Sequence, residues 1–326
     1  MRRQKNAQSH IQQTTFNKRD KIYDRLIESC IILLIILTPL AYGAVLPQSI
    51  AIFEVTAALM FLLWILRMLS NSKLEFTSHP LTPFIFLFIF YISLQLFFTL
   101  VTRHSSLVTL SVSDVWSPGS IYPWATKTEL LKVISYAMIF IVTLNTIKTR
   151  QQINRMLSII IAVGFVMGVF FIMRYLGAEA PQGFVNPDHY SAYLGMIIPL
   201  AFGFLLVTSL TTERYTQIAM RVLLFFCVIV MSTALFFTMS RGGMFSFILA
   251  LLFMALLVWR RKPIRGRGWI MSANVVCIIL TIAWLGATPV VERILSIKAE
   301  IASKYIGGRL PIWEGTFNII KDYPLF

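Results

Sequence analysis

The sequence predicts an all-α protein that crosses a membrane several times, and two observations support this fold class. Hydrophobic residues make up 57% of the 326-residue chain, and the mean hydropathy is +0.75. Such values exclude a soluble globular domain and a disordered chain. Apolar runs also recur along the sequence, and most have about the length that crosses roughly 30 Å of hydrocarbon as a helix. The fold is therefore expected to be a polytopic helical membrane protein.

The apolar runs predict about nine transmembrane helices. In chain order they lie at about residues 26–45, 50–69, 81–101, 130–147, 156–176, 190–208, 221–239, 244–258 and 270–287. The first of them is expected to break near Pro39 and Gly43. These spans divide the chain into a basic tail at residues 1–25, a transmembrane domain at 26–287 and a terminal segment at 288–326.

The distribution of charge predicts the orientation of these helices. The chain carries 29 Lys and Arg against 14 Asp and Glu, a formal net charge of +15. Most of the basic residues lie in the tail and in the short segments at about 67–73, 148–155, 214–221 and 260–267. Because basic residues concentrate on the cytoplasmic side, the N-terminus is expected inside. Topology thus accounts for the positive charge, and no nucleic-acid partner is expected.

This orientation places three segments on the outer side: the loops at 102–128 and 177–189, and the terminal segment. In the terminal segment, apolar residues recur at spacings of three and four from Val291 to Ile306, which predicts an amphipathic helix on the membrane surface. Gly307 and Gly308 are expected to end it. Pro311 then opens a second short amphipathic helix.

No motif of a soluble enzyme is present. The sequence contains no Walker loop, no Gly-x-Gly-x-x-Gly, no His-Glu-x-x-His and no Cys-x-x-Cys. Its three cysteines, Cys30, Cys227 and Cys277, all lie in apolar spans, so neither a disulfide nor a metal cluster is expected. The remaining candidates for chemistry are polar groups that face outward at membrane depth.

The first candidate is Arg241, in the short polar turn Ser240-Arg241-Gly242-Gly243 between two apolar spans. Its guanidinium fork suits the diphosphate of a lipid at the membrane surface. The two glycines are expected to let the backbone turn tightly and expose its N–H groups to phosphate. The alternative is an interfacial arginine that snorkels to water or caps a neighbouring helix.

The second candidate is the segment that leads into the sixth span. Asn186 or Asp188 is suited to cap that helix, which is the structural explanation for a polar residue there. His189 is suited to bind an acceptor hydroxyl or a phosphate, although a histidine at the start of a helix is more often simply solvated.

Three further residues are candidates for the same outer site. Arg309 follows two glycines and is either a second clamp for phosphate or sugar or a solvated loop arginine. Arg174, at the outer end of the fifth span, either lines the cavity or anchors the helix at the interface. Glu54 lies inside the second span, where an acid is a functional candidate or the partner of an arginine.

These segments together resemble a known family. The motifs are the Ser240–Gly243 turn, Phe184-Val-Asn-Pro-Asp-His189 before the sixth span, and Arg309, Trp313 and Asp322-Tyr-Pro-Leu325 near the end. They are similar to those of the O-antigen ligase and O-antigen polymerase superfamily, which are bacterial inner-membrane glycosyltransferases. The resemblance covers about residues 20–326, and the order of the motifs makes it fairly specific.

The resemblance implies a function at the outer face of the inner membrane. Such proteins take a glycan from an undecaprenyl-diphosphate carrier and join it to an acceptor hydroxyl, as in lipopolysaccharide or surface polysaccharide assembly. The acceptor is lipid A–core in ligases, another glycan repeat in polymerases and a protein in some relatives. The transfer is inverting and needs no metal or cofactor. Arg241 and Arg309 match the arginines that hold the diphosphate leaving group.

The sequence also departs from the family pattern. Family members continue beyond the Pro-Leu segment with a glycine-rich turn, a periplasmic histidine and further spans, so we expect the chain to be truncated at its C-terminus and to lack part of the active site. His189 lies in an earlier loop and does not replace that histidine. The alternatives are therefore a polymerase, an inactive fragment, and a transporter or flippase of lipid-linked sugars.

Overall fold

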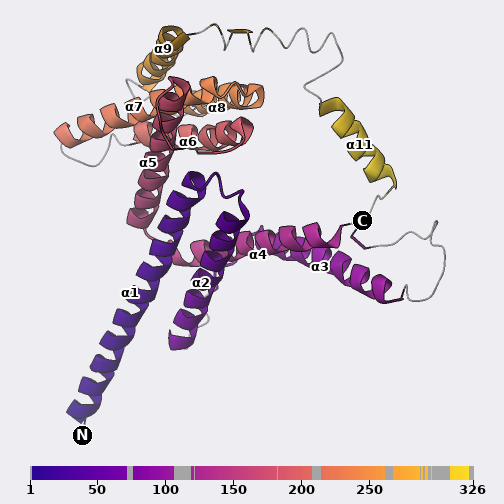
Figure 1. Cartoon of the computed structure of the whole chain (residues 1–326). Coiled ribbons are helices and arrows are strands. Elements are labelled where there is room, and N and C mark those ends of the chain that lie inside the picture. Colours follow the sequence, from indigo (N-terminus) through magenta and orange to yellow (C-terminus); the bar gives the residue numbers. More distant parts are fainter. Residues whose placement is uncertain are drawn as a thin grey trace. The chain divides into compact units, whose positions relative to one another are not determined.

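The computed structural model describes residues 2–71, 76–105, 119–120, 122–181, 183–207, 214–260, 267–286, 288, 291–292, 295 and 309–322. Every regular element in these residues is an α-helix, which confirms the predicted all-α class (Figure 1). The helices are α1 (Arg2–Leu40), α2 (Pro47–Asn71), α3 (Thr82–Ser105), α4 (Pro123–Thr146), α5 (Arg150–Tyr175), α6 (Pro187–Val207), α7 (Arg214–Phe237), α8 (Arg241–Arg260), α9 (Arg267–Gly286) and α11 (Arg309–Asp322).

Within the described ranges, six helices are long and apolar enough to cross a membrane. They are Pro47–Ser70, Thr82–Val101, Pro123–Thr146, Arg150–Tyr175, Pro187–Leu206 and Ile218–Phe237. These correspond to the second to seventh predicted spans. The first, eighth and ninth predicted spans fall in α1, α8 and α9, and their crossing of the membrane stays a prediction. Helix α8 includes a shorter apolar stretch, Arg241–Leu257.

Helix α1 ends close to the predicted break. Pro39 lies in its last turn, and the next residues include Tyr42, Gly43 and Ala44 with φ of 57°, 73° and 55°. Glycine adopts such angles without steric strain, whereas Tyr42 and Ala44 are strained there by their Cβ atoms. A Cβ atom on Gly43 would also overlap the ring of Phe184. Two constraints therefore require glycine at this position.

The start of α4 corrects the sequence prediction. Residues 123–128 were expected to belong to a polar loop before a span at 130–147, but the helix begins at Pro123. Proline fits the first turn because its missing N–H would have no helical partner there. The hydroxyls of Thr126 and Thr128 donate to the carbonyls of Tyr122 and Trp124, so polar residues are satisfied within the helix.

The terminal segment is described in part. The short helix expected after Gly308 is present as α11 and begins two residues before Pro311. Its side chains Trp313, Phe317 and Ile320 are exposed. The amphipathic helix predicted at 291–306 lies mostly outside the described residues.

The chain forms two compact units, and each has its own packing. Unit 1 comprises Met1–Ile31, Ile50–Lys148 and Gly307–Phe326, and unit 2 comprises Ile32–Ser49 and Thr149–Ile306. The division into tail, transmembrane domain and terminal segment, at residues 25 and 287, describes the relation to a membrane and stays a prediction.

In unit 1, α3 packs against α4, and a buried amide ties the chain before α3 to α4. Asn145, only 2% exposed, accepts from the Thr77 N–H at 2.7 Å and donates to the Ile141 carbonyl at 2.8 Å. Because both ends of this buried amide have hydrogen-bond partners, its burial leaves no polar atom unsatisfied.

Unit 1 also contains an ion pair between α1 and α2. The Arg67 guanidinium lies 2.8 Å from a carboxylate oxygen of Asp24. Burial nevertheless raises the pKa of Asp24 above its usual value, because desolvation outweighs the attraction of Arg67.

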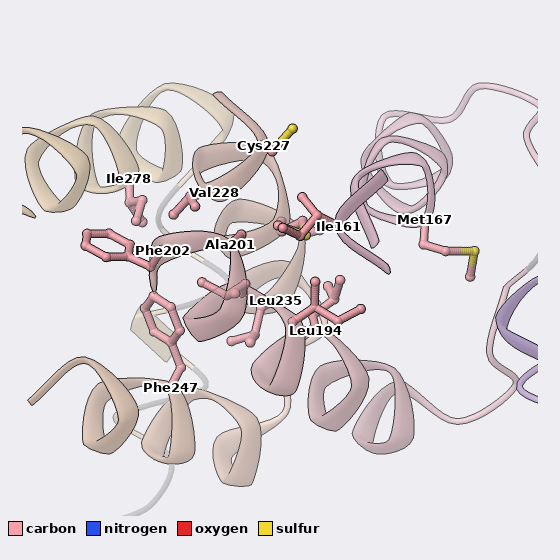
Figure 2. Close-up of a cluster of buried hydrophobic side chains, with 14 of the residues drawn as sticks. Ile161, Met167, Leu194, Ala201, Phe202, Cys227, Val228, Leu235, Phe247 and Ile278 are labelled. Atoms are coloured by element: carbon pink, nitrogen blue, oxygen red, sulfur yellow. The ribbon is translucent and has the colours of Figure 1, made fainter. Parts of the chain in front are cut away.

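Unit 2 contains the largest group of buried apolar side chains. Helix α7 contacts α5, α6, α8 and α9, and α6 contacts α5 and α8 as well. Figure 2 shows side chains from these helices converging, including Leu194 and Phe202 of α6, Leu235 of α7 and Phe247 of α8. All four are at most 3% exposed.

Small residues let the helices of unit 2 approach closely. A Cβ on Gly164 of α5 would lie 3.0 Å from atoms of Ile197 in α6 and Met231 in α7. At the start of α8, a Cβ on Gly243 would overlap the Ser191 side chain of α6. Between apolar helices in lipid the hydrophobic effect gives no drive to associate, so close van der Waals packing across small residues is what holds them together.

We predict that Gly243→Ala lowers the melting temperature of the purified protein. The added methyl group has no space against Ser191, and overpacking of this kind costs about 1–3 kcal/mol. Gly242→Ala is the matched control, because nothing lies within 4 Å of a Cβ at Gly242. That variant is expected to melt at or above the wild-type temperature, since alanine favours helix.

A double-mutant cycle tests whether Ser191 is the cause. In a Ser191→Gly background, Gly243→Ala is expected to cost much less stability than in the wild type. An equal cost in both backgrounds would show that the α6–α8 contact does not explain the requirement for glycine.

Candidate functional site

The turn before α8 is formed by residues 238–240 rather than by the glycines. Met239 has a φ of 55°, and the Thr238 hydroxyl donates to the Leu235 carbonyl at 2.7 Å. Ser240 then caps α8, because its Oγ accepts from the Gly243 N–H at 3.3 Å. The expectation that the two glycines make the tight turn is therefore wrong. They are already helical, and Gly243 is needed for contact with α6.

Arg241 is the first residue of α8. Its side chain is partly exposed, and its Nε atom is buried. An arginine held at a capped helix start is placed more firmly than one in a loop, since the backbone that carries it is hydrogen-bonded from its first turn. The Met244 N–H donates to the Ser240 carbonyl at 3.0 Å and closes that turn.

Asn186 is the residue that caps α6. Its side-chain oxygen accepts from the Asp188 N–H at 2.8 Å, and its carbonyl accepts from the Tyr190 N–H at 3.1 Å. Pro187 occupies the first helical position, as expected for proline. Of the two capping residues considered, Asn186 is the one used. His189 is exposed in the first turn of the same helix.

The first turns of α6 and α8 lie next to each other. Ser191 contacts Gly243. Ser191 lies two residues after His189, and Gly243 lies two residues after Arg241. Both helices therefore begin at the same end of unit 2. The N-terminus of a helix carries about half a positive charge, and Arg241 adds a cation at the start of α8, which favours an anion there. At the start of α6, Asp188 places a carboxylate in the first turn.

The ends of α5 and α7 reach the same end of unit 2. The rings of Tyr175, in the last turn of α5, and Phe237, the last residue of α7, are 4.4 Å apart. Nearby, Phe171 of α5 stacks on Tyr190 of α6 at 5.1 Å. This arrangement agrees with the alternating path predicted for the fifth to eighth spans. Which side of the membrane it faces stays a prediction.

A cavity of about 150 Å³ opens at this end of unit 2. It lies between the last turns of α5, the segment before α6 and the first turn of α6, and Arg174 lines it. The Arg174 side chain is exposed, so the cation has access to solvent. Arg174 therefore lines a cavity at the end of α5, and its role in substrate binding stays a prediction.

Two of the predicted site residues belong to unit 1. Glu54 lies in α2 and is partly buried, and no ion pair to it occurs among the described side chains. Arg309 is the first residue of α11, and its side chain lies outside the described residues. The other four candidates lie in unit 2, at helix ends that are close together: Arg174, Asn186, His189 and Arg241.

Sequence reasoning missed the roles of several residues at this end of unit 2. Ser240 carried a signal, since a serine before a helix is a common cap. For Ser191 and Tyr190 the sequence gave no indication of a role, because a polar or aromatic residue in the first turn of a span can have many different neighbours. Among the described residues no three His, Cys, Asp or Glu side chains are grouped to hold a metal.

The comparison with protein families matches the O-antigen ligase family at residues 226–326. The match begins within α7, includes α8 and α9, and contains both Arg241 and Arg309. Comparison with curated proteins gives no significant match, and comparison with solved structures gives none either. The family match confirms the resemblance over this part of the chain and supports a ligase- or polymerase-type role in polysaccharide assembly. Residues 226–326 are therefore similar to the O-antigen ligase family, in a chain with several helices long and apolar enough to cross a membrane.

Proposed function

We propose that the protein transfers a glycan from an undecaprenyl-diphosphate carrier to an acceptor hydroxyl at the periplasmic face of the bacterial inner membrane. The acceptor oxygen bonds to the anomeric carbon from the side opposite the phosphate, and the acceptor proton passes to a base. The bond between that carbon and the phosphate oxygen breaks, and undecaprenyl diphosphate leaves.

One observation carries this proposal: the capped start of α8, with Arg241 as its first residue, lies against the start of α6. Helix α8 belongs to the region that matches the O-antigen ligase family. A departing diphosphate gains negative charge as its bond to the sugar breaks. Positive charge fixed in place before the reaction stabilises that transition state without further reorganisation. Arg241 and the start of α8 supply such charge at the predicted outer face.

The other residues take supporting roles in the proposal. Arg309 is a second clamp on the diphosphate. Arg174 and His189 belong to the substrate cavity, and Asn186 shapes it by capping α6. Glu54, in unit 1, stays a candidate substrate-binding residue from the sequence. The lipid-linked oligosaccharide is the donor, and lipids of the membrane surround the protein.

The identity of the acceptor distinguishes a ligase from a polymerase. Lipid A–core as acceptor makes the protein a ligase, another glycan repeat makes it a polymerase, and a protein acceptor is a further variant. We favour the ligase because the matched family carries that description. A transporter of lipid-linked sugars would need polar groups near the middle of the bilayer. Arg241 and Arg174 instead lie at helix ends, which favours chemistry at the surface.

We predict that Arg241→Ala lowers the rate of glycan transfer on the order of 100-fold, as loss of a fixed charge-stabilising donor does in other enzymes. Arg241→Lys keeps the charge but not the two-pronged fork, so it should retain part of the activity. The measurement is transfer from lipid-linked oligosaccharide to acceptor in membrane vesicles that contain equal amounts of each full-length variant.

Arg150→Ala is the matched control for this experiment. Arg150 is the exposed first residue of α5, at the opposite end of that helix from Arg174. Its loss is expected to leave transfer unchanged. If Arg241→Ala transfers glycan as fast as the wild type, Arg241 does not clamp the diphosphate.

We also predict that transfer needs no divalent cation, because arginines supply the positive charge in the proposed site. Vesicles treated with EDTA are expected to keep the rate of untreated vesicles. A large loss of activity that Mg²⁺ or Mn²⁺ restores would contradict this expectation and would shift the role of holding the diphosphate to a metal.

A further inference from the structure

Helix α3 is the least enclosed of the six apolar helices in the described ranges. Only 6% of its apolar stretch is buried, whereas 22% to 50% is buried in the other five. Helix α4 packs along one side of it and is its main neighbour among the described helices. Apolar surface of this kind can simply face lipid, so exposure alone does not indicate a partner for α3.

One face of α3 has the spacing of a seam between paired helices. Phe84, Phe88, Tyr91 and Gln95 follow one another at intervals of four, three and four residues. This alternation keeps the four side chains in line where one helix packs at a shallow angle against another, as in coiled coils and membrane bundles. The first three are exposed, and Gln95 is partly exposed. We call these four residues the α3 seam.

A hollow of about 500 Å³ lies on the same side of α3. All of its lining residues belong to this one helix: Phe84, Leu87, Phe88, Phe90, Tyr91 and Leu94. Where helices pair, each side chain of a seam inserts into a hole formed by side chains of the facing helix. A hollow bordered by a single helix therefore has the shape that receives side chains of a second one.

Gln95 is the polar member of the α3 seam and lies inside the span. It is six residues from the nearer end of Thr82–Val101, which is about 9 Å along a helix. Its Nε2 atom donates to the Tyr91 hydroxyl at 3.2 Å, and the side-chain amide makes no other hydrogen bond among the described residues. A second N–H and the carbonyl oxygen remain. Lipid chains offer neither a partner, so another polar group is required at this depth.

A second copy of the protein supplies such a group by symmetry. Copies inserted into one membrane share the same orientation, so a two-fold axis along the bilayer normal makes their α3 helices parallel. Gln95 of one copy then lies at the same depth as Gln95 of the other. A primary amide is both donor and acceptor, so it is complementary to itself. A single polar residue in an apolar seam also fixes the register of a helix pair.

We propose that the protein forms a two-fold dimer in the membrane through the α3 seam, with the Gln95 amides of the two copies hydrogen-bonded to each other. Lipid would cover the phenylalanines but leave the amide unsatisfied. Another span of the same chain would need a polar group at this depth, whereas a second copy always has one. The inference does not rest on glycan transfer, because no residue of the seam belongs to the proposed diphosphate site.

The test measures association of the full-length protein in liposomes. Copies labelled at the N-terminus with a donor or an acceptor fluorophore are mixed, and energy transfer is recorded as the ratio of lipid to protein rises. The wild type is expected to follow a monomer–dimer equilibrium. Gln95→Leu keeps the size of the side chain but removes the amide, so it is expected to weaken dimerisation about tenfold.

Gln151→Leu is the matched control, because Gln151 is exposed in the first turn of α5 and lies outside the seam. It is expected to associate like the wild type. Gln95→Asn keeps an amide on a shorter side chain and is expected to retain more association than Gln95→Leu. The proposal is overturned if the wild type stays monomeric at every ratio of lipid to protein, or if Gln95→Leu associates as strongly as the wild type.

Disulfide crosslinking locates the interface independently. Cys30, Cys227 and Cys277 are replaced by alanine, and one cysteine is introduced by Phe88→Cys in the seam or by Phe97→Cys. Phe88 and Phe97 are nine residues apart, which places them on opposite sides of the helix, and they are 52% and 59% exposed. Oxidation in liposomes is expected to give a crosslinked dimer from Phe88→Cys and little from Phe97→Cys. Equal yields, or no crosslink at position 88, would show that the copies do not meet at the seam.

Discussion

The close approach of α6 and α8 is the constraint on which the candidate site depends. Helices in lipid gain little from hiding apolar surface against each other, so their packing depends on residues small enough to let the backbones meet. Gly243 provides that space, and Ser191 fills it. As a result the first turns of the two helices lie side by side. A larger residue at 243 would separate them and displace Arg241 with its helix.

The electrostatics of this region follow from that packing. One arginine near a membrane surface has an ordinary explanation, since it can snorkel to water. Arg241 differs because it begins a helix whose first turn is capped by Ser240 and held against a second helix start. The partial charge at the start of α8 adds to its own. Such fixed charge suits an anion that becomes more negative during a reaction, as a leaving diphosphate does.

Most of the polar side chains near the starts of α6 and α8 have hydrogen-bond partners within the protein. Asn186 and Ser240 cap their helices, and the hydroxyls of Ser191 and Thr238 donate to nearby carbonyls. These bonds account for the residues without any ligand. Tyr190 is the exception, with a buried hydroxyl that finds no partner in the described part of the chain.

The sequence by itself determined the helical class and six spans, because long apolar runs leave the backbone few ways to satisfy its hydrogen bonds in lipid. It also placed the polar ends at Arg241 and Arg174 and predicted a cap at the start of α6. It misplaced the start of α4 and gave Gly242 and Gly243 the wrong role, since a glycine for turning and a glycine for packing look alike in sequence. Only the tertiary structure decided that Gly243 meets Ser191 and that Tyr190 lines a cavity with Phe171. Those contacts join residues far apart in the chain, and no local pattern specifies which helix faces which.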